Sequence, residues 1–176
     1  MLTFLAQSIE PHFFSTEHIH VLLNHIPIIG LGAATLGLAI ALIQKSRPAE
    51  IVALILVFLT SALAWPVNVT GTRSYENIQD ISDKNGIAWL DEHMHRAEKT
   101  EPAFYVLAAL ALAALLVPRK WPRATTPLTL LTLLLAIACT AAGGWIALAG
   151  GRVRHPEFRT SQIPPAESPN HQHTHP

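Results

Sequence analysis

Four long stretches of the chain are apolar and contain no charged side chain. They are residues 19–44, 51–69, 102–117 and 127–151. Because a bilayer core of about 30 Å is crossed by about 20 helical residues, each stretch predicts a membrane-spanning helix. The third stretch is short, and we expect its helix to extend into the preceding sequence. Four such helices leave too little polar surface for a soluble protein, so the sequence predicts an all-α membrane protein built as a four-helix transmembrane bundle.

The charge and cysteine content of the chain exclude several classes of protein. Only 14% of its 176 residues are charged, against about 25% in typical soluble domains. Twelve basic and twelve acidic residues cancel, and without a basic excess we expect no nucleic-acid partner. The single cysteine, Cys139, excludes an internal disulfide, a CxxC pair and the CxxCH motif of covalently attached haem. Any cofactor must therefore be held by other side chains.

The two short connections between spans are basic. Their cations are Lys45, Arg47, Arg119, Lys120 and Arg123. Because short cytoplasmic loops are enriched in Lys and Arg, this pattern predicts that both connections face the cytoplasm and both chain termini lie outside. Three arginines that follow the fourth span weakly favour the opposite orientation. The expected outer segments are the N-terminal residues 1–18, the loop 70–101 and the tail 152–176.

Two of the outer segments have features of their own. Apolar side chains recur every three or four residues between Gly86 and Thr100, a spacing that predicts an amphipathic outer helix running into the third span. Pro102 is expected to kink or break that helix. The tail is rich in proline and polar residues from about residue 161, and we expect disorder there. The membrane domain itself is expected to cover residues 19–151.

All ten histidines fall in the predicted outer segments or at the outer end of a span. They are His12, His18, His20, His25, His93, His95, His155, His171, His173 and His175. The inner connections and the interior of the spans contain none. This distribution predicts a polar site at one membrane surface rather than a proton path across the membrane.

Antiparallel packing is expected to bring three of these histidines together. His25, His93 and His155 lie at the outer ends of the first, third and fourth spans, so a bundle presents their imidazoles to one centre. If the first helix starts before His18, then His18 and His25, seven residues apart, share a helical face and His20 faces away from it. If the helix instead begins with Asn24 as its N-cap, His18 and His20 lie on a separate segment. We therefore predict a site formed by His25, His93 and His155.

Four pieces of the sequence resemble a family of bacterial four-span membrane proteins that is catalogued as a domain of unknown function. They are the segment Leu23-Asn24-His25-Ile26-Pro27, the Thr70-Gly71 pair with Glu76, the stretch His93 to Ala97, and Gly151-Arg152-Val153-Arg154-His155-Pro156-Glu157. The resemblance covers residues 19–158. It implies a multi-pass protein of the bacterial inner membrane, and it marks His25, His93, His155 and Glu157 as site residues.

The leading hypothesis is a haem b module that transfers electrons. The layout is similar to that of small b-type cytochromes, which hold haem with histidines near the ends of four helices. His25, His93 and His155 are the candidate ligands, and Arg152 and Arg154 are the candidate partners of the haem propionates. No histidine lies at the inner helix ends, so at most one haem, on the outer side, is expected. Small residues at helical spacing on the first and fourth spans suit either a porphyrin or close helix packing.

Two other hypotheses remain open from the sequence. One is a zinc or copper site formed by His25, His93 and His155 with Glu157, because imidazole and carboxylate groups suit these ions. The other is a cofactor-free accessory or assembly subunit of a larger membrane complex. The expected partners are the lipid bilayer and a redox complex or a soluble cytochrome, which the acidic outer loop would meet. No HExxH motif is present, so a hydrolase has no specific support. We expect a redox subunit rather than a stand-alone enzyme.

Overall fold

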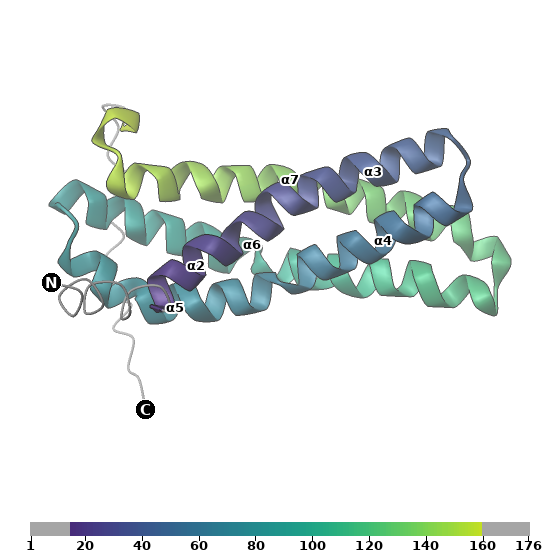
Figure 1. Ribbon diagram of the computed structural model, residues 1–176, viewed down its shortest axis with the longest axis horizontal. Helices are drawn as coiled ribbons and strands as arrows, with labels where there is room; N and C mark the ends of the chain where they lie inside the picture. The colour runs from purple at the N-terminus through teal and green to yellow at the C-terminus, as the bar shows by residue number, and fades with distance from the viewer. Residues whose placement is uncertain (1–14, 160–176) are drawn as a thin grey trace, which may run out of the picture.

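The chain folds into long antiparallel helices. The computed structural model describes residues 15–159, and no strand occurs within them. The elements are α2 (Thr16–His25), η1 (Ile26–Gly30), α3 (Leu31–Ile43), α4 (Arg47–Ala62), α5 (Ala64–Asp80), α6 (Lys84–Leu116), η2 (Val117–Arg119), η3 (Pro122–Ala124), α7 (Thr125–Arg154) and η4 (Pro156–Phe158). They join into four rods that run side by side (Figure 1). The tail from residue 161, for which we predicted disorder, lies outside the described residues.

Each rod is long and apolar enough to cross a membrane. The rods are Thr16–Ile43, Arg47–Asp80, Lys84–Arg119 and Pro122–Arg154. They confirm the prediction of an all-α four-helix bundle and indicate a multi-pass membrane protein. With 28 to 36 residues, the rods are about 42–54 Å long at 1.5 Å per residue, which exceeds a bilayer core of about 30 Å. Part of the bundle therefore extends beyond the hydrocarbon.

Residues 70–101 do not form the loop that we expected. α5 and α6 continue through this region and leave only residues 81–83 between them. Asp83 starts α6 as its N-cap, where its carboxylate accepts a hydrogen bond of 2.6 Å from the Gly86 N–H. The fall in hydropathy marks the place where a helix leaves the hydrocarbon, and it does not mark the end of the helix.

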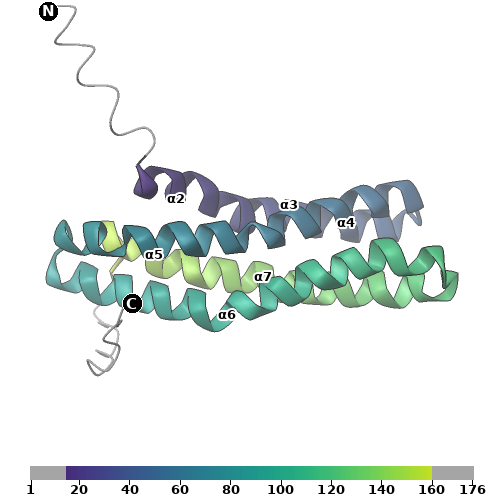
Figure 2. The ribbon, with the colours of Figure 1, turned by 90° about the horizontal axis from the view of Figure 1, so that it is seen from below.

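The third rod consists almost entirely of α6, a single helix of 33 residues. Pro102 lies inside it and removes one backbone donor, which bends a helix without necessarily ending it. Figure 2 shows that α6 changes direction part-way along its length. The amphipathic stretch that begins at Gly86 and the third apolar stretch thus belong to one continuous helix.

The first rod changes its winding between α2 and α3. Pro27 has no N–H to donate, and residues Ile26–Gly30 form a π-helical turn in which the Leu31 N–H donates to the Ile26 carbonyl. α2 packs mainly on α5 and has no buried residue, whereas α3 contains a series of buried residues. α2 is therefore held loosely.

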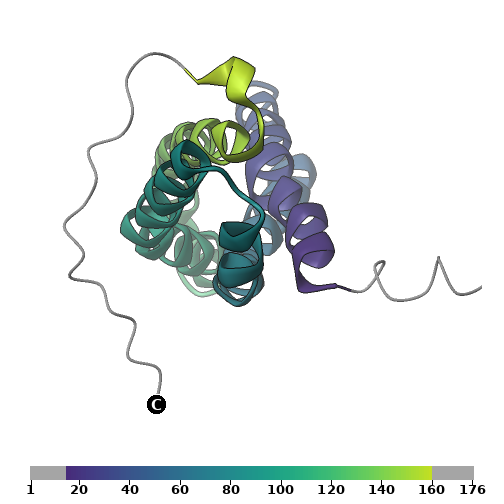
Figure 3. The ribbon, with the colours of Figure 1, turned by 90° about the vertical axis from the view of Figure 1, so that its left-hand side faces the viewer.

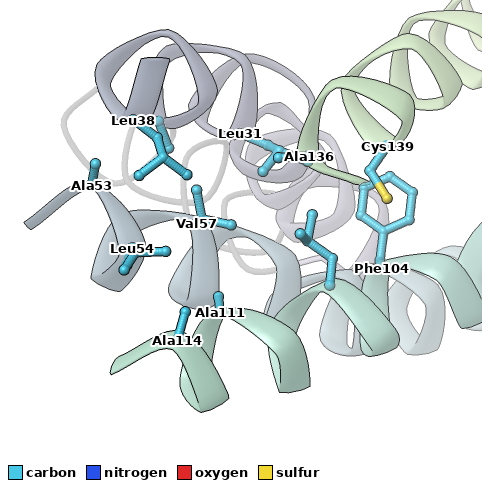
Figure 4. Packing of buried hydrophobic residues seen from close by; sticks show 12 residues of the cluster. Leu31, Leu38, Ala53, Leu54, Val57, Phe104, Ala111, Ala114, Ala136 and Cys139 are labelled. Carbon is cyan, nitrogen blue, oxygen red and sulfur yellow. The ribbon is translucent and has the colours of Figure 1, made fainter. Parts of the chain in front are cut away.

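The main hydrophobic core lies in the half of the bundle that α3, α4, α6 and α7 form (Figure 4). Its largest fully buried apolar side chains include Leu31, Leu38, Leu54, Val57 and Leu107. Buried alanines lie between them, and such small residues allow membrane helices to approach closely. The packing in this half fixes the positions of α6 and α7, which continue into the other half of the bundle.

We name the two ends of the bundle by the groups that lie there. The basic end holds the connections between α3 and α4 and between α6 and α7 (Figure 1). Five cations lie at these connections: Lys45, Arg47, Arg119, Lys120 and Arg123. The site end holds the start of α2, the end of α5, the start of α6 and the end of α7. A second apolar cluster packs α6 against α7 at the site end and consists of Trp89, Leu90, Ala149 and Val153.

The segment that follows α7 is fastened to the start of α6. The Arg159 guanidinium donates to both carboxylate oxygens of Asp83, at 2.9 and 2.7 Å, and to the carbonyls of Arg152 and Val153. The hydrogen bond from Arg159 lowers the pKa of the Asp83 carboxyl. Gly86 fits closely beneath this segment, since a Cβ there would lie 2.8 Å from the Val153 carbonyl oxygen.

Candidate functional site

A cavity of about 590 Å³ lies towards the site end, between α2, α5, α6 and α7. Figure 3 looks at this end, where the four helices meet. The lining is mostly apolar, and the volume is within the range of about 300–1,000 Å³ that is typical of small-molecule and cofactor sites. The four histidines in the lining are His20, His25, His93 and His155. The structure thus brings the three histidines of our sequence prediction to one cavity, and it adds His20.

His20 reaches the cavity from α2 and rests on α5. Its Nδ1 lies 3.0 Å from the Val67 carbonyl oxygen and 3.2 Å from the Thr70 hydroxyl oxygen. The ring occupies space that the absence of a side chain at Gly71 leaves open, because a Cβ there would lie 2.8 Å from His20 Cε1. The ring is half-buried and fixed by α5 on one side.

His93 reaches the cavity from α6 and rests on α7. Its Nδ1 lies 3.1 Å from the Ile146 carbonyl oxygen. A Cβ at Gly150 would lie 3.0 Å from the same nitrogen, so this glycine allows the imidazole to approach the α7 backbone. The ring lines the same cavity as the His20 ring.

The two histidines are held by the same arrangement. Each ring nitrogen Nδ1 contacts a carbonyl four residues before a glycine, so the carbonyl and the glycine lie one helical turn apart on the same face. A carbonyl oxygen only accepts hydrogen bonds, so Nδ1 carries the proton and the neutral ring keeps its lone pair on Nε2. Within residues 15–159, neither Nε2 has a hydrogen-bond partner. Neither atom is among the fully buried polar atoms that lack a partner, so each has some exposed surface. Both lone pairs are therefore accessible.

His20 and His93 also lie at the same height in the bundle. Ile43 and Leu116 are the last residues of α3 and α6 at the basic end. His20 lies twenty-three residues before Ile43, and His93 lies twenty-three residues before Leu116. At 1.5 Å per residue this is roughly 35 Å. If the bilayer core of about 30 Å begins at the basic end, both rings lie just beyond it, at the level of the lipid headgroups.

His25 and His155 line the cavity but are exposed. The His25 Nδ1–H donates to the Val21 carbonyl of its own helix at 2.6 Å. His155 Nδ1 lies 2.9 Å from a Glu157 carboxylate oxygen. Hydrogen bonds from the backbone N–H of Glu157 itself and from His155 lower the pKa of the Glu157 carboxyl. These two histidines therefore lie at the edge of the cavity, and Glu157 pairs with one of them outside the lining.

The arginines at the site end have different positions. Arg154 lines the cavity and donates to the Ile81 carbonyl at 3.1 Å. Arg152 is turned away, with its guanidinium stacked 4.4 Å from the centre of the Trp89 ring. Arg96 is buried between the Glu92 carboxylate and the Trp145 ring. Of the two arginines predicted from the sequence, only Arg154 contributes to the cavity.

The next feature is the spacing of the side chains that could bind a metal ion. No three His, Cys, Asp or Glu side chains among residues 15–159 lie close enough together to hold a metal ion. His25, His93, His155 and Glu157 thus share one region of the structure without forming a compact ligand set in it. His20 and His93 are the pair whose ring orientation is fixed by contacts with neighbouring helices.

His20 corrects our expectation from the sequence. For a first helix that starts before His18, the spacing of His18 and His25 predicts that His20 faces away from the site. α2 instead turns His20 towards α5 and leaves His18 exposed outside the cavity lining. The signal in the sequence that concerns His20 is Gly71, whose missing side chain makes room for the ring, and this can be recognised only when α2 and α5 are paired.

Comparisons with known proteins identify no relative of this chain. No family model, curated protein or solved structure gives a significant match. The resemblance of the motifs to the bacterial four-span family remains a prediction. The function must therefore be argued from the geometry of the cavity itself.

Proposed function

We propose that this protein is a haem b-binding electron-transfer module of the bacterial inner membrane, in which the imidazoles of His20 and His93 would hold the iron. The observation that carries the proposal is the matched fixation of these two rings. Both present an accessible Nε2 lone pair at the same height in one apolar cavity. Donation of the other ring N–H to a carbonyl is the usual way in which proteins orient a metal-ligating histidine.

The other features of the cavity also fit haem. Its mostly apolar lining would exclude water from a porphyrin, and Gly71 and Gly150 leave room for the ligand rings. Arg154 is the cation at the cavity that would pair with a propionate, and His155 lies beside it. A haem held in this way supplies one-electron transfer, with a potential tuned by its two imidazoles and their hydrogen bonds.

Each residue of the site then has a physical task. The carbonyls of Val67 and Ile146 hold the Nδ1 protons of the two histidines, which keeps Nε2 unprotonated and fixes the planes of the rings. α2 brings His20 to the cavity, whereas α6 holds His93 on the well-packed side. The guanidinium of Arg154 would compensate the negative charge of a haem propionate at the edge of the cavity.

The orientation in the membrane follows from the cations at the basic end. If they face the cytoplasm, the site end and the cavity face the periplasm. A redox complex or a soluble cytochrome would then exchange electrons at the site end. The lipid bilayer surrounds the remainder of the bundle.

The proposal is tested by absorption spectra of the purified protein in its oxidised and reduced forms. We expect a b-type spectrum and full extraction of the haem by acidified acetone, because no CxxCH motif is present to bind it covalently. His20→Ala and His93→Ala should each lose most of the haem, and the double variant should lose little more, because the ligands act as one unit.

His18→Ala and His95→Ala are the matched controls, since they change exposed histidines of the same two helices outside the cavity lining. Both should keep their haem. A protein without haem, or one that keeps it in both ligand variants, would contradict the proposal. Zinc or copper found by elemental analysis and lost on replacing His25 would favour the non-haem metal hypothesis. Normal assembly without any cofactor would favour the accessory subunit.

A further inference from the structure

The lining of the cavity includes one acidic side chain, which is partly exposed. Glu101 lines it and lies fifteen residues before Leu116, the basic end of α6. This distance is roughly 22 Å, so Glu101 lies within a hydrocarbon core of about 30 Å that begins at the basic end. The sequence predicts an outer loop that ends at this residue. An ionisable side chain at such a depth is costly to maintain, and it commonly marks a functional site.

Glu101 is not neutralised by a cation. The hydroxyl of Tyr105, one helical turn further along α6, donates a hydrogen bond to it. Among residues 15–159, no lysine, arginine or histidine lies within ion-pair distance of its carboxylate. A carboxylate accepts several hydrogen bonds, so Glu101 retains the capacity to accept one from a molecule in the cavity.

The cavity reaches the outer surface of the bundle beside the first rod. Two apolar residues that line it, Val21 and Ile29, are 54% and 64% exposed. Ile29 lies fourteen residues before Ile43, or roughly 21 Å from the basic end, which is the depth of Glu101. If the hydrocarbon core begins at the basic end, an opening beside the exposed Ile29 would face it and would admit molecules that are dissolved in the bilayer.

We propose that the part of the cavity around Glu101 binds a bilayer-soluble quinol and its quinone. The electron-transfer part of this inference rests on the proposed haem function, whereas the binding of the quinol does not. A quinol ring suits the apolar surroundings of Phe104 and Ile29, one of its hydroxyls donates to the Glu101 carboxylate, and its apolar tail extends through the opening into the lipid.

The oxidation of one quinol to quinone releases two electrons and two protons. The Glu101 carboxylate takes the proton of the hydroxyl that it binds. His25 takes the second proton on Nε2, which is unprotonated because Nδ1 donates to the Val21 carbonyl. The two electrons would pass one at a time to an oxidised one-electron acceptor at the site end, the soluble cytochrome or redox complex proposed above, and a bound haem would supply the route between them.

The test uses the purified full-length protein with decylubiquinone as the probe. Its binding is followed by the quenching of tryptophan fluorescence, which does not depend on haem. We expect saturable binding by the wild type and binding weaker by about tenfold or more in Glu101→Gln, because a hydrogen bond to a charged acceptor is lost. The matched control is Glu98→Gln, an exposed residue of the same helix outside the cavity lining, which should bind as the wild type does.

A second variant, Ile29→Trp, narrows the opening at an exposed position and should also weaken binding while Glu101 remains in place. The absence of saturable binding, equal binding by Glu101→Gln and the wild type, or equally effective competition by a fatty acid would overturn the inference. Failure of the two proposals is distinguishable. A normal haem spectrum without quinone binding removes only the quinol site, whereas Glu101-dependent binding without haem removes only the haem function.

Discussion

The His20 imidazole occupies the space in which a side chain at position 71 would lie. A Cβ on Gly71 would come within 2.8 Å of His20 Cε1, a distance that real Cβ atoms do not tolerate. The same ring is hydrogen-bonded to the carbonyl of Val67, one turn earlier on α5. The position of a histidine on one helix is thus set by the absence of a side chain on another.

The first prediction follows from this contact. Gly71→Ala should push the His20 ring away from the Val67 carbonyl and lower the affinity for haem by about tenfold or more, as loss of a ligand-orienting contact commonly does. The haem content of the purified variant measures this effect. Gly37→Ala is the control, because a Cβ at position 37 meets nothing within 4 Å. Equal haem content in the two variants would contradict the role of Gly71.

The second prediction concerns the other ligand. Gly150→Ala introduces a Cβ 3.0 Å from His93 Nδ1, so the ring must move by a few tenths of an ångström and weaken its bond to the Ile146 carbonyl. We expect a shift of the haem midpoint potential with a smaller loss of haem than in Gly71→Ala. Gly144→Ala on the same helix is the control, since its Cβ has open space. A potential unchanged by Gly150→Ala would show that this contact does not orient His93.

The third prediction concerns acid stability. The hydrogen bond from Arg159 lowers the folded-state pKa of Asp83, so this contact contributes stability above the unfolded-state pKa, near 3.8, and loses it as pH falls through the folded-state value. The thermal midpoint of the wild type should therefore fall more steeply below about pH 4 than that of Asp83→Asn. Parallel pH profiles of the two proteins would show that the contact does not stabilise the site end.

The fourth prediction concerns orientation. Reporters fused after Arg47 and after Arg123 should be cytoplasmic, and a reporter fused after Phe158 should be periplasmic, because the basic connections remain inside. Enzymatic reporters that are active in only one compartment provide the measurement. A cytoplasmic reporter after Phe158 would place the cavity on the inner side and remove a periplasmic electron acceptor from the proposal.

The architecture was largely predictable, because charge-free apolar stretches of sufficient length have few folds open to them. The extent of the helices was not, since hydropathy falls at the membrane surface whereas backbone hydrogen bonding continues to Asp80 and resumes at Lys84. Helix continuity through Pro102 was left open by the sequence for a similar reason. A proline removes a hydrogen bond, and the surrounding packing decides whether the helix ends.

The site was predictable only in part. The grouping of histidines at one end followed from their distribution along the chain and the antiparallel order of the helices. The sequence does not show which histidine of α2 enters the cavity, because this depends on which face of α2 meets α5. Glu101 was missed because its depth depends on the continuity of α6 through Pro102 and not on local hydropathy.

The absence of buried residues in α2 has a thermodynamic consequence. A helix that gains little from its own packing is the first part of a structure to open locally, and any molecule bound between it and its neighbours stabilises the closed form by mass action. The exchange rates of the backbone amides of Thr16–His25 should therefore report directly on the occupancy of the cavity, while those of α3 should not. Residues 16–25 thus report ligand binding through a property of the fold itself, the absence of buried side chains in this helix.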